Sequence, residues 1–196
     1  MRQGKGPQPA GHSRLMRILR AGDHRQMPWK NGGGVTTEVA ISSPDATVSN
    51  FDWRISMAKV PASGPFSAFA NIERVLAVLD GEMLLTIGND SAVFMGPASP
   101  AIAFPGDTPT SADVIGDVTD LNVMTRRGKF DAGVRRLDQA EVVAHADETF
   151  VLFRSDAETA TGEVLGVDDV IQLSRFERLA FAIGPENAWL IEIRAI

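Results

Sequence analysis

The chain has 196 residues, of which 44% are hydrophobic and 22% are charged, and its formal net charge is −6. This length suits one large domain or two small β units, and no apolar run is long enough to span a membrane. An acidic chain without a basic stripe argues against nucleic acid as the main partner. The absence of cysteine excludes disulfides, thiolate metal sites and a cysteine nucleophile, and it fits a cytoplasmic protein.

Residues 1–15 are rich in Gly, Pro and Gln and have no apolar pattern, so we expect a disordered N-terminal extension. A first strand is expected at "MRILR", which begins at Met16. Beyond it, short segments rich in Val, Ile and Phe alternate with Gly, Pro, Asp and Asn, as is typical of strands and turns. The clearest strands are expected at 35–41, 51–60, 74–87, 100–106 and 120–125 and, in a second set, at 148–155, 168–174, 177–183 and 188–196.

Two stretches carry more specific predictions. Asp80-Gly81 lies between two apolar runs and predicts a tight hairpin turn, because a type I′ turn needs positive φ at both central residues. Residues 128–140 come nearest to a helical pattern and are expected to form a short helix or a connector. Many short strands at regular spacing favour a sandwich or barrel. The two sets indicate two β units, 16–128 and 129–196, with an approximate boundary that allows strands to be shared.

The stretch "MPWKNGGGVTTEVA" from Met27 to Ala40 has a lysine beside three glycines, which raises the question of a phosphate loop. The lysine precedes the glycines and a β-branched strand follows them, whereas a phosphate loop needs the reverse order and a helix. Two interpretations stay open. The glycines either let the backbone approach a ligand closely, or they form a bulge or tight turn that shapes a barrel rim.

Polar side chains alternate with apolar ones in several expected strands. In "FDWRISMAKV", Trp53 and Ile55 share one face with Met57, while Arg54 and Ser56 share the other. The same alternation places Thr36 with Glu38, and Asp120 with Asn122. Each polar face is either solvated or part of a shared polar cavity, in which Arg54 grips a carboxylate. Arg74 is either an ordinary charge at a strand start or a second anion contact.

The three histidines, His12, His24 and His145, do not form a metal-binding pattern, and no thiolate is present. The same scarcity weakens a Ser-His-Asp triad. We therefore expect no metal and no other cofactor.

The motifs "MPWKNGGGVTTEVA", "FDWRISMAKV", "GPFSAF", "ERVLAVLDGEMLL", "FPGD" and "DLNVMTRRG" occur in this order and resemble the HutD/Ves family. The resemblance implies an all-β, bicupin-like fold of two cupin-like antiparallel β-barrels in one compact chain. It also implies a link to bacterial histidine utilisation, with a pathway intermediate such as N-formylglutamate as ligand; other members are linked to stress responses. Thr37 stands where the family often has Arg, and Ala70-Asn71 where it commonly has Pro-Gly.

The leading hypothesis is a metal-free binder of a small anionic amino-acid derivative, without nucleic-acid or membrane partners; a homodimer is left open. Arg54 would pair with the ligand carboxylate, the loop and polar side chains would add hydrogen bonds, and two aromatic rings would form apolar walls. Two alternatives remain: a metal-free isomerase or hydrolase with Glu38 as general base, and an interaction module without a ligand. The candidate ligand-binding residues are Trp29, Asn31, Gly32, Gly33, Gly34, Thr36, Glu38, Arg54, Ser56, Phe66, Arg74 and Asn122.

Overall fold

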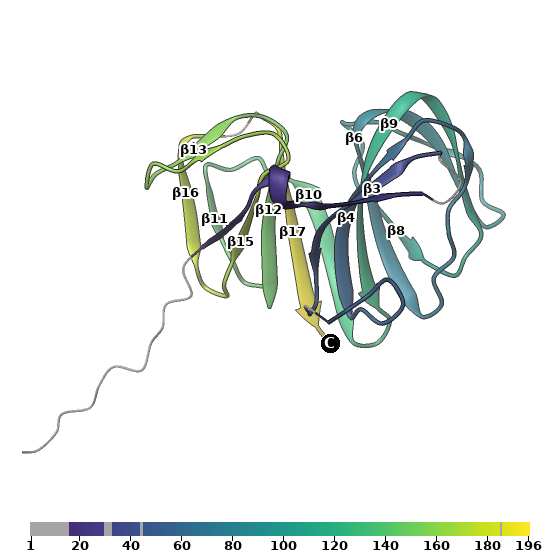
Figure 1. Cartoon of the computed structure of the whole chain (residues 1–196), viewed down its shortest axis with the longest axis horizontal. Helices are drawn as coiled ribbons and strands as arrows, with labels where there is room; N and C mark the ends of the chain where they lie inside the picture. Colours follow the sequence, from purple (N-terminus) through teal and green to yellow (C-terminus); the bar gives the residue numbers. More distant parts are fainter. Residues whose placement is uncertain (1–15, 30–32, 44, 185) are drawn as a thin grey trace, which may run out of the picture.

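The computed structural model describes residues 16–29, 33–43, 45–184 and 186–196, and the extension expected at 1–15 lies outside them. Within these residues the chain is all-β, with one short 3-10 helix, η1 (Ala21–Asp23), and no α-helix. Figure 1 shows two lobes side by side, a first part with β2 to β9 and a second part with β11 to β16. No helix in the described ranges has the length and apolar character needed to cross a lipid bilayer.

The first part is built on an eight-stranded antiparallel sheet in the order β2-β3-β4-β9-β6-β7, with β5 beside β9 and β8 beside β6. The two longest strands, β6 and β9, pair along most of their length and extend through the whole first part. The strands are β2 (Arg25–Pro28), β3 (Val35–Ile41), β4 (Trp53–Val60), β5 (Gly64–Pro65), β6 (Ile72–Ile87), β7 (Val93–Met95), β8 (Ile102–Pro105) and β9 (Thr110–Arg126).

The second part has a five-stranded sheet, β1-β15-β12-β17-β10, and a four-stranded sheet, β11-β16-β13-β14. The all-β prediction is confirmed, but no sheet closes into a barrel among the described residues. The strands are β1 (Arg17–Leu19), β10 (Phe130–Arg136), β11 (Glu141–Val143), β12 (Glu148–Phe153), β13 (Ala157–Thr159), β14 (Val164–Leu165), β15 (Val170–Leu173), β16 (Arg178–Ile183) and β17 (Ala188–Ala195).

The first strand joins the second part. The sequence analysis placed residues 17–19 in the first β unit, whereas β1 pairs antiparallel with β15, with Ile18 opposite Ile171. The chain then passes through η1 and enters the first part at β2, and Figure 1 shows η1 between the two lobes. One strand from the N-terminal side of the expected boundary therefore pairs with a strand from its C-terminal side.

Two local predictions are wrong. Asp80-Gly81 forms no hairpin, because β6 runs through it and pairs with β9 on both sides, with a register shift at these residues. Gly81 uses its positive φ of 77° in this irregularity, where a Cβ atom would collide with the carbonyl oxygen of Asp117. Residues 130–136, expected as helix or connector, form β10 and pair with β17.

The eight-stranded and five-stranded sheets pack face to face through apolar side chains. Trp53 and Ile55 from β4 meet Phe150 from β12 and Ile191 from β17 in one buried cluster. The rings of Trp53 and Phe150 lie 5.6 Å apart in an edge-to-face contact. This shared core fixes one face of the eight-stranded sheet against the second part, so the other face of that sheet points into the first part.

Candidate functional site

Polar side chains from four neighbouring strands lie on the face of the eight-stranded sheet that points into the first part. Glu38 on β3 is opposite Ser56 on β4, which is opposite Asn122 on β9. Arg54 and Arg74 are both opposite Met124, one from each side. Directly opposed residues in antiparallel strands point to the same face. We call this set the inner face: Thr36, Glu38, Arg54, Ser56, Arg74, Asp120 and Asn122.

Most of the inner face is buried, and its remaining residues, Thr36, Glu38 and Asn122, are partly buried. Arg54 is 4% exposed and Ser56 is 2% exposed, although the neighbouring Trp53 and Ile55 are buried on the opposite side of the same strand. The sequence alternation thus predicted correctly which side chains share a face. Of the two interpretations left open for β4, a polar face in water is excluded.

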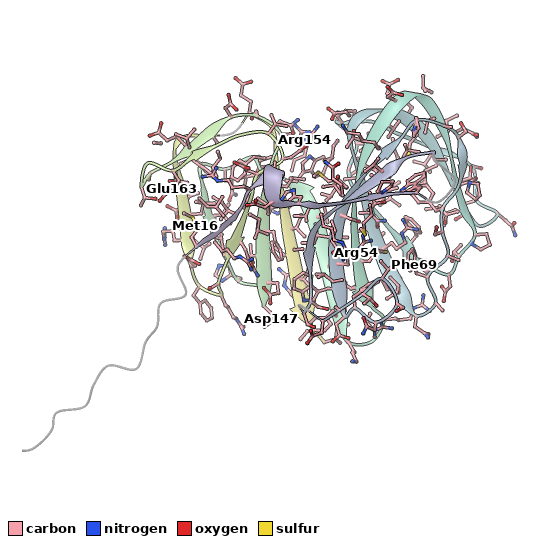
Figure 2. All side chains as sticks on the ribbon, viewed as in Figure 1. Met16, Arg54, Phe69, Asp147, Arg154 and Glu163 are labelled. Carbon is pink, nitrogen blue, oxygen red and sulfur yellow. The ribbon has the colours of Figure 1, made fainter. Side chains whose placement is uncertain are left out.

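Arg54 already has a carboxylate partner within the chain. Its Nε donates to Oε2 of Glu38 at 2.7 Å, and the two side chains are only 5% and 11% exposed. Figure 2 labels Arg54 on the sheet near the junction of the two lobes. The structure therefore shows the Nε of Arg54 in an ion pair with a carboxylate of the same chain.

Arg74 on β6 is equally buried, at 3% exposure, but its polar contacts are weaker. Its Nε lies 3.4 Å from Oδ1 of Asn122, and its Nη1 lies 3.3 Å from the carbonyl oxygen of Ser67. Both exceed the roughly 2.9 Å of a typical hydrogen bond. The guanidinium carbon lies 4.9 Å from the ring centre of Phe66 and 5.2 Å from that of Phe104. Burial lowers the pKa of Arg74 to about 10, against the opposing effect of Asp120.

Asp120 on β9 is 2% exposed, and its Oδ1 has no hydrogen-bond partner among the described residues. Burial raises its pKa to about 7, although the Arg74 charge and the backbone of Ala58 act in the opposite direction. A buried carboxylate without full partners strongly disfavours its charged form. Asp120 and Arg74 therefore influence each other's pKa through their charges, although no ion pair within 4.0 Å joins them in the described part of the chain.

The described end of the glycine-rich stretch, Gly33 and Gly34, leads directly into β3. Of the predicted residues, Asn31 and Gly32 lie outside the described residues, and Gly33 is in the bend before β3. Trp29 Nε1 donates to Thr36 Oγ1 at 2.8 Å. A Cβ atom on Gly34 would lie 2.6 Å from the carbonyl oxygen of Lys59 and 2.9 Å from the Trp29 ring. Gly34 therefore lets the backbone approach other residues of the same chain closely, namely Lys59 and Trp29.

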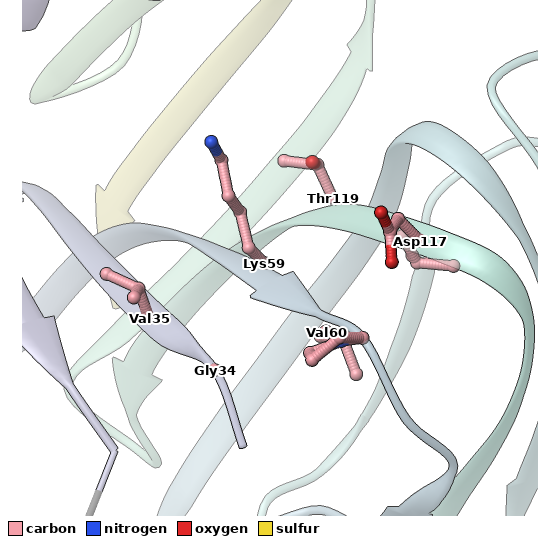
Figure 3. A pocket seen from close by; sticks show the side chains of 8 residues that line it. Gly34, Val35, Lys59, Val60, Asp117 and Thr119 are labelled. Carbon is pink, nitrogen blue, oxygen red and sulfur yellow. The ribbon is translucent and has the colours of Figure 1, made fainter. Parts of the chain in front are cut away.

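An open pocket of about 480 Å³ lies next to Gly34, beside the start of β3, the end of β4 and the middle of β9 (Figure 3). Lys59 and Thr119 are opposite each other there and alternate along their strands with Ala58 and Asp120, so they point away from the inner face. Of the predicted ligand-binding residues, it includes Gly34 alone. Its lining residues are Gly34, Val35, Lys59, Val60, Pro61, Asp117, Val118 and Thr119.

The structure offers no ready metal site in the residues it describes, because no group of three or more His, Asp or Glu side chains is placed to hold an ion. The donors gathered on the inner face are guanidinium, hydroxyl and amide groups. These donors suit a carboxylate ligand, and the two carboxylates on the same face, Glu38 and Asp120, do not belong to a group of three among the described residues.

Sequence reasoning missed three residues that complete the surroundings of Arg74. Phe104 and Phe69 place their rings 5.2 Å and 6.0 Å from its guanidinium carbon, and Asp120 influences its charge. Phe104 belongs to the "FPGD" motif, and Asp120 belongs to an alternating pattern that was recognised. Both signals were present, but neither indicated that these side chains would meet Arg74.

Solved structures with little sequence similarity share this fold. The bacterial pirin YhhW of Escherichia coli, solved in complex with nickel(II), is 10% identical, with a TM-score of 0.65 over 93% of this chain and 100% of that one. The protein is thus an all-β protein of the cupin-like class. More specifically, residues 21–191 match the HutD family, and the chain belongs to that family.

Individual relatives agree with this assignment. A curated "uncharacterized 21.2 kDa protein in hutC 3'region" of Pseudomonas putida is 33% identical over 84% of this chain and 90% of its own length. Protein Ves of Citrobacter koseri is 34% identical over 68% of this chain and 66% of its own. HutD from Pseudomonas fluorescens SBW25, solved in a formate condition, is 29% identical, with a TM-score of 0.79 over 92% of this chain and 99% of that chain.

Proposed function

We propose that this protein binds a small carboxylic acid, such as N-formylglutamate, on its inner face without a metal ion, and thereby modulates histidine utilisation. The observation that carries the proposal is Arg74, a guanidinium that is 3% exposed and that, among the described residues, holds only two long hydrogen bonds. A buried guanidinium gains most from a bidentate anionic partner, and a carboxylate has the matching geometry.

The surroundings of Arg74 support the same class of ligand. Phe66 and Phe104 place aromatic rings beside its guanidinium and form apolar walls, while Asn122 supplies an amide group. Arg54 contributes positive charge but, because it is paired with Glu38, it acts mainly by holding the sheet face in place. Arg74 therefore replaces Arg54 as the proposed partner of the ligand carboxylate, a role that the sequence analysis assigned to Arg54.

The link to histidine utilisation rests on the relatives. The Pseudomonas putida relative is named for its position beside hutC, and the Pseudomonas fluorescens relative is called HutD. We extend that link to this chain, place its action in the cytoplasm and propose that its two parts are cupin-like units of a bicupin. Thr37, in place of a common family Arg on β3, is opposite Met57 and therefore lies on the other face of the sheet from Glu38.

Isothermal titration calorimetry with N-formylglutamate tests the proposal. A charge-assisted hydrogen bond contributes about 1.5–3 kcal/mol, so Arg74→Met should weaken binding about 10- to 150-fold. Arg178→Met is the matched control, because Arg178 is exposed on the second part and should leave the affinity unchanged. Arg74→Lys keeps the charge but not the planar fork, and we expect an intermediate affinity. Equal binding by wild type and Arg74→Met, or no binding by wild type, would contradict the proposal.

A metal-free enzyme remains the second candidate, and Asp120 is the observation that favours it. A carboxyl group whose pKa is raised to about 7 exchanges protons readily at neutral pH, as a general acid or base must. The sequence analysis gave this role to Glu38, which the structure pairs with Arg54. Turnover of N-formylglutamate that disappears in Asp120→Asn would support an enzyme, whereas tight binding without turnover would reject it.

A further inference from the structure

The charged groups of the inner face balance one another. Arg54 and Arg74 carry two positive charges, and Glu38 and Asp120 carry two negative charges when both are ionised. All four side chains lie on adjacent strands of one sheet, and the described residues supply no further buried charge to this face. A ligand carboxylate that enters here therefore adds a negative charge to a group that is already neutral.

The remaining charged groups near the face do not change this balance. Arg25 on β2 is opposite Glu38, but it is exposed at the sheet edge. Arg126 is at the far end of β9, where its Nε donates to the carbonyl oxygen of Phe51 at 3.1 Å. Lys59 on β4 points to the opposite side of the sheet. Solvent screens exposed charges far more strongly than buried ones.

Burial of an uncompensated charge is costly, and proteins avoid it by pairing the charge or by moving a proton. Of the two carboxylates, Glu38 is held by Arg54 at 2.7 Å. Asp120 has an unpartnered oxygen and no ion pair within 4.0 Å in the described residues. A proton added to Asp120 restores neutrality without breaking an existing ion pair, whereas a proton added to Glu38 would break one.

We propose that the inner face takes up its anionic ligand together with one proton from solvent, and that Asp120 is the group that holds this proton. The inference rests on the proposed function and adds its proton stoichiometry. Only an O–H bond forms, at a carboxylate oxygen of Asp120, and no other bond changes. Arg74 lies within electrostatic reach of Asp120, so its charge becomes available to the ligand carboxylate as Asp120 is neutralised.

Two consequences follow for the ligand. A site that pairs each bound anion with one proton favours a single carboxylate at Arg74, so any second carboxylate of the ligand must lie toward solvent. Affinity should also depend on pH. Uptake of one proton makes the affinity fall about tenfold per pH unit above the pKa of the free group. That pKa is about 7 for Asp120, so binding should be nearly constant below pH 6 and weaken above pH 7.

Calorimetry at pH 8 in two buffers with different ionisation enthalpies measures the number of protons taken up with N-formylglutamate. We expect about one proton per ligand for wild type, because Asp120 is mostly ionised in the free protein at this pH. Asp120→Asn should take up none and should bind with an affinity that no longer falls between pH 7 and pH 9. Asp113→Asn, which removes an exposed carboxylate on the same strand, should behave as wild type.

The outcomes separate this inference from the proposed function. Wild type that binds N-formylglutamate without proton uptake would overturn the inference and leave the proposed function intact. Wild type that does not bind at any pH would overturn both. If Asp120→Asn does not fold, carbon-13 spectroscopy of the aspartate carboxyl groups in wild type replaces it. The Asp120 signal should titrate near pH 7 and shift to higher pH with the ligand, and titration near pH 4 in either state would reject the inference.

Discussion

The interiors of the two parts differ although both are built from antiparallel strands. The first part buries Arg54, Arg74 and Asp120 on one sheet face. The interior of the second part is lined by aliphatic and aromatic side chains, among them Phe153 and Leu190. Asp169 is the buried charge of the second part in the described residues, and it accepts hydrogen bonds from Arg20 and the backbone amides of Ala21 and Gly166.

This difference agrees with the proposal that the first part binds the ligand, and it has consequences for stability. A buried charge that is poorly paired lowers the free energy of unfolding, whereas close apolar packing raises it. The interior of the second part is mostly apolar, and its buried charge, Asp169, is well supplied with hydrogen bonds. The poorly paired charges on the inner face of the first part cost stability, and the shared core with Trp53 and Phe150 lies on the opposite face of the same sheet, where it packs against the second part. Four changes test the contrast, and they follow in order of the effect we expect.

Arg54→Met should give the largest loss of stability, about 4 kcal/mol, because it leaves the largely buried Glu38 carboxylate without its ion-pair partner. Chemical denaturation of the purified variant measures the loss. The double variant with Glu38→Gln removes both charges and should recover more than half of it. A double variant as unstable as the single one would show that packing of the arginine stem, rather than the ion pair, matters in this interior.

Asp120→Asn should change how stability depends on pH. The pKa of Asp120 is raised to about 7 in the folded protein, so the folded state keeps a proton that the unfolded chain loses near pH 4. The free energy of unfolding therefore falls as pH rises from 4 to 7, by about 3 kcal/mol between pH 5 and pH 8. The variant should lack this fall. Thermal denaturation at several pH values measures it, and Asp113→Asn should keep the wild-type profile.

Gly34→Ala should lower stability by about 2 kcal/mol, because its Cβ atom would overlap the Lys59 carbonyl oxygen and the Trp29 ring. Gly133→Ala in β10 is the control, since a Cβ atom there meets nothing within 4 Å, and we expect it to be neutral or slightly stabilising. Thermal denaturation compares the two. Equal effects would mean that the close approach at the edge of the first part is easily relieved.

Arg178→Ala should have the smallest effect. Arg178 pairs with Glu141 on the surface of the second part, where the two side chains are 65% and 44% exposed. Exposed ion pairs contribute less than about 1 kcal/mol. Urea denaturation should show a change within that limit. A larger loss would contradict the difference drawn between the two parts, because surface charges of the second part would then contribute as much to the free energy of unfolding as buried charges of the first.

The sequence predicted local structure well where one signal decides it. The β-branched run at 35–41 matches β3 residue for residue. At Asp80-Gly81 a hairpin and a bulge both need a positive φ at Gly81, and the pairing with β9 shows which of them forms. In β10, Phe130, Ala132 and Val134 pack against the shared core with a period of two, but the nearby charges and glycine gave the stretch a helical appearance.

For the site, alternation identified the shared face but not its environment. The alternation of Asp120 and Asn122 is equally compatible with a strand that faces water and with a strand that faces a closed interior. The difference depends on what covers the strand, here aromatic residues such as Phe66 and Phe104, which come from other segments of the chain. The weaker contacts of Arg74 and the stronger ion pair of Arg54 likewise depend on three-dimensional distances that no spacing rule supplies.

The pairing of β1 with β15 has a consequence for how the protein is made. The backbone nitrogen of Met16 donates to Oε1 of Glu177, which is 161 residues further along the chain. During translation β1 is synthesised long before its partner β15. It therefore remains unpaired until nearly the whole polypeptide has left the ribosome. Contacts between such distant residues form slowly, because a long loop must close first. Cleavage near residue 128 would also separate β1 from its own sheet, so the two halves should be unable to fold as independent fragments.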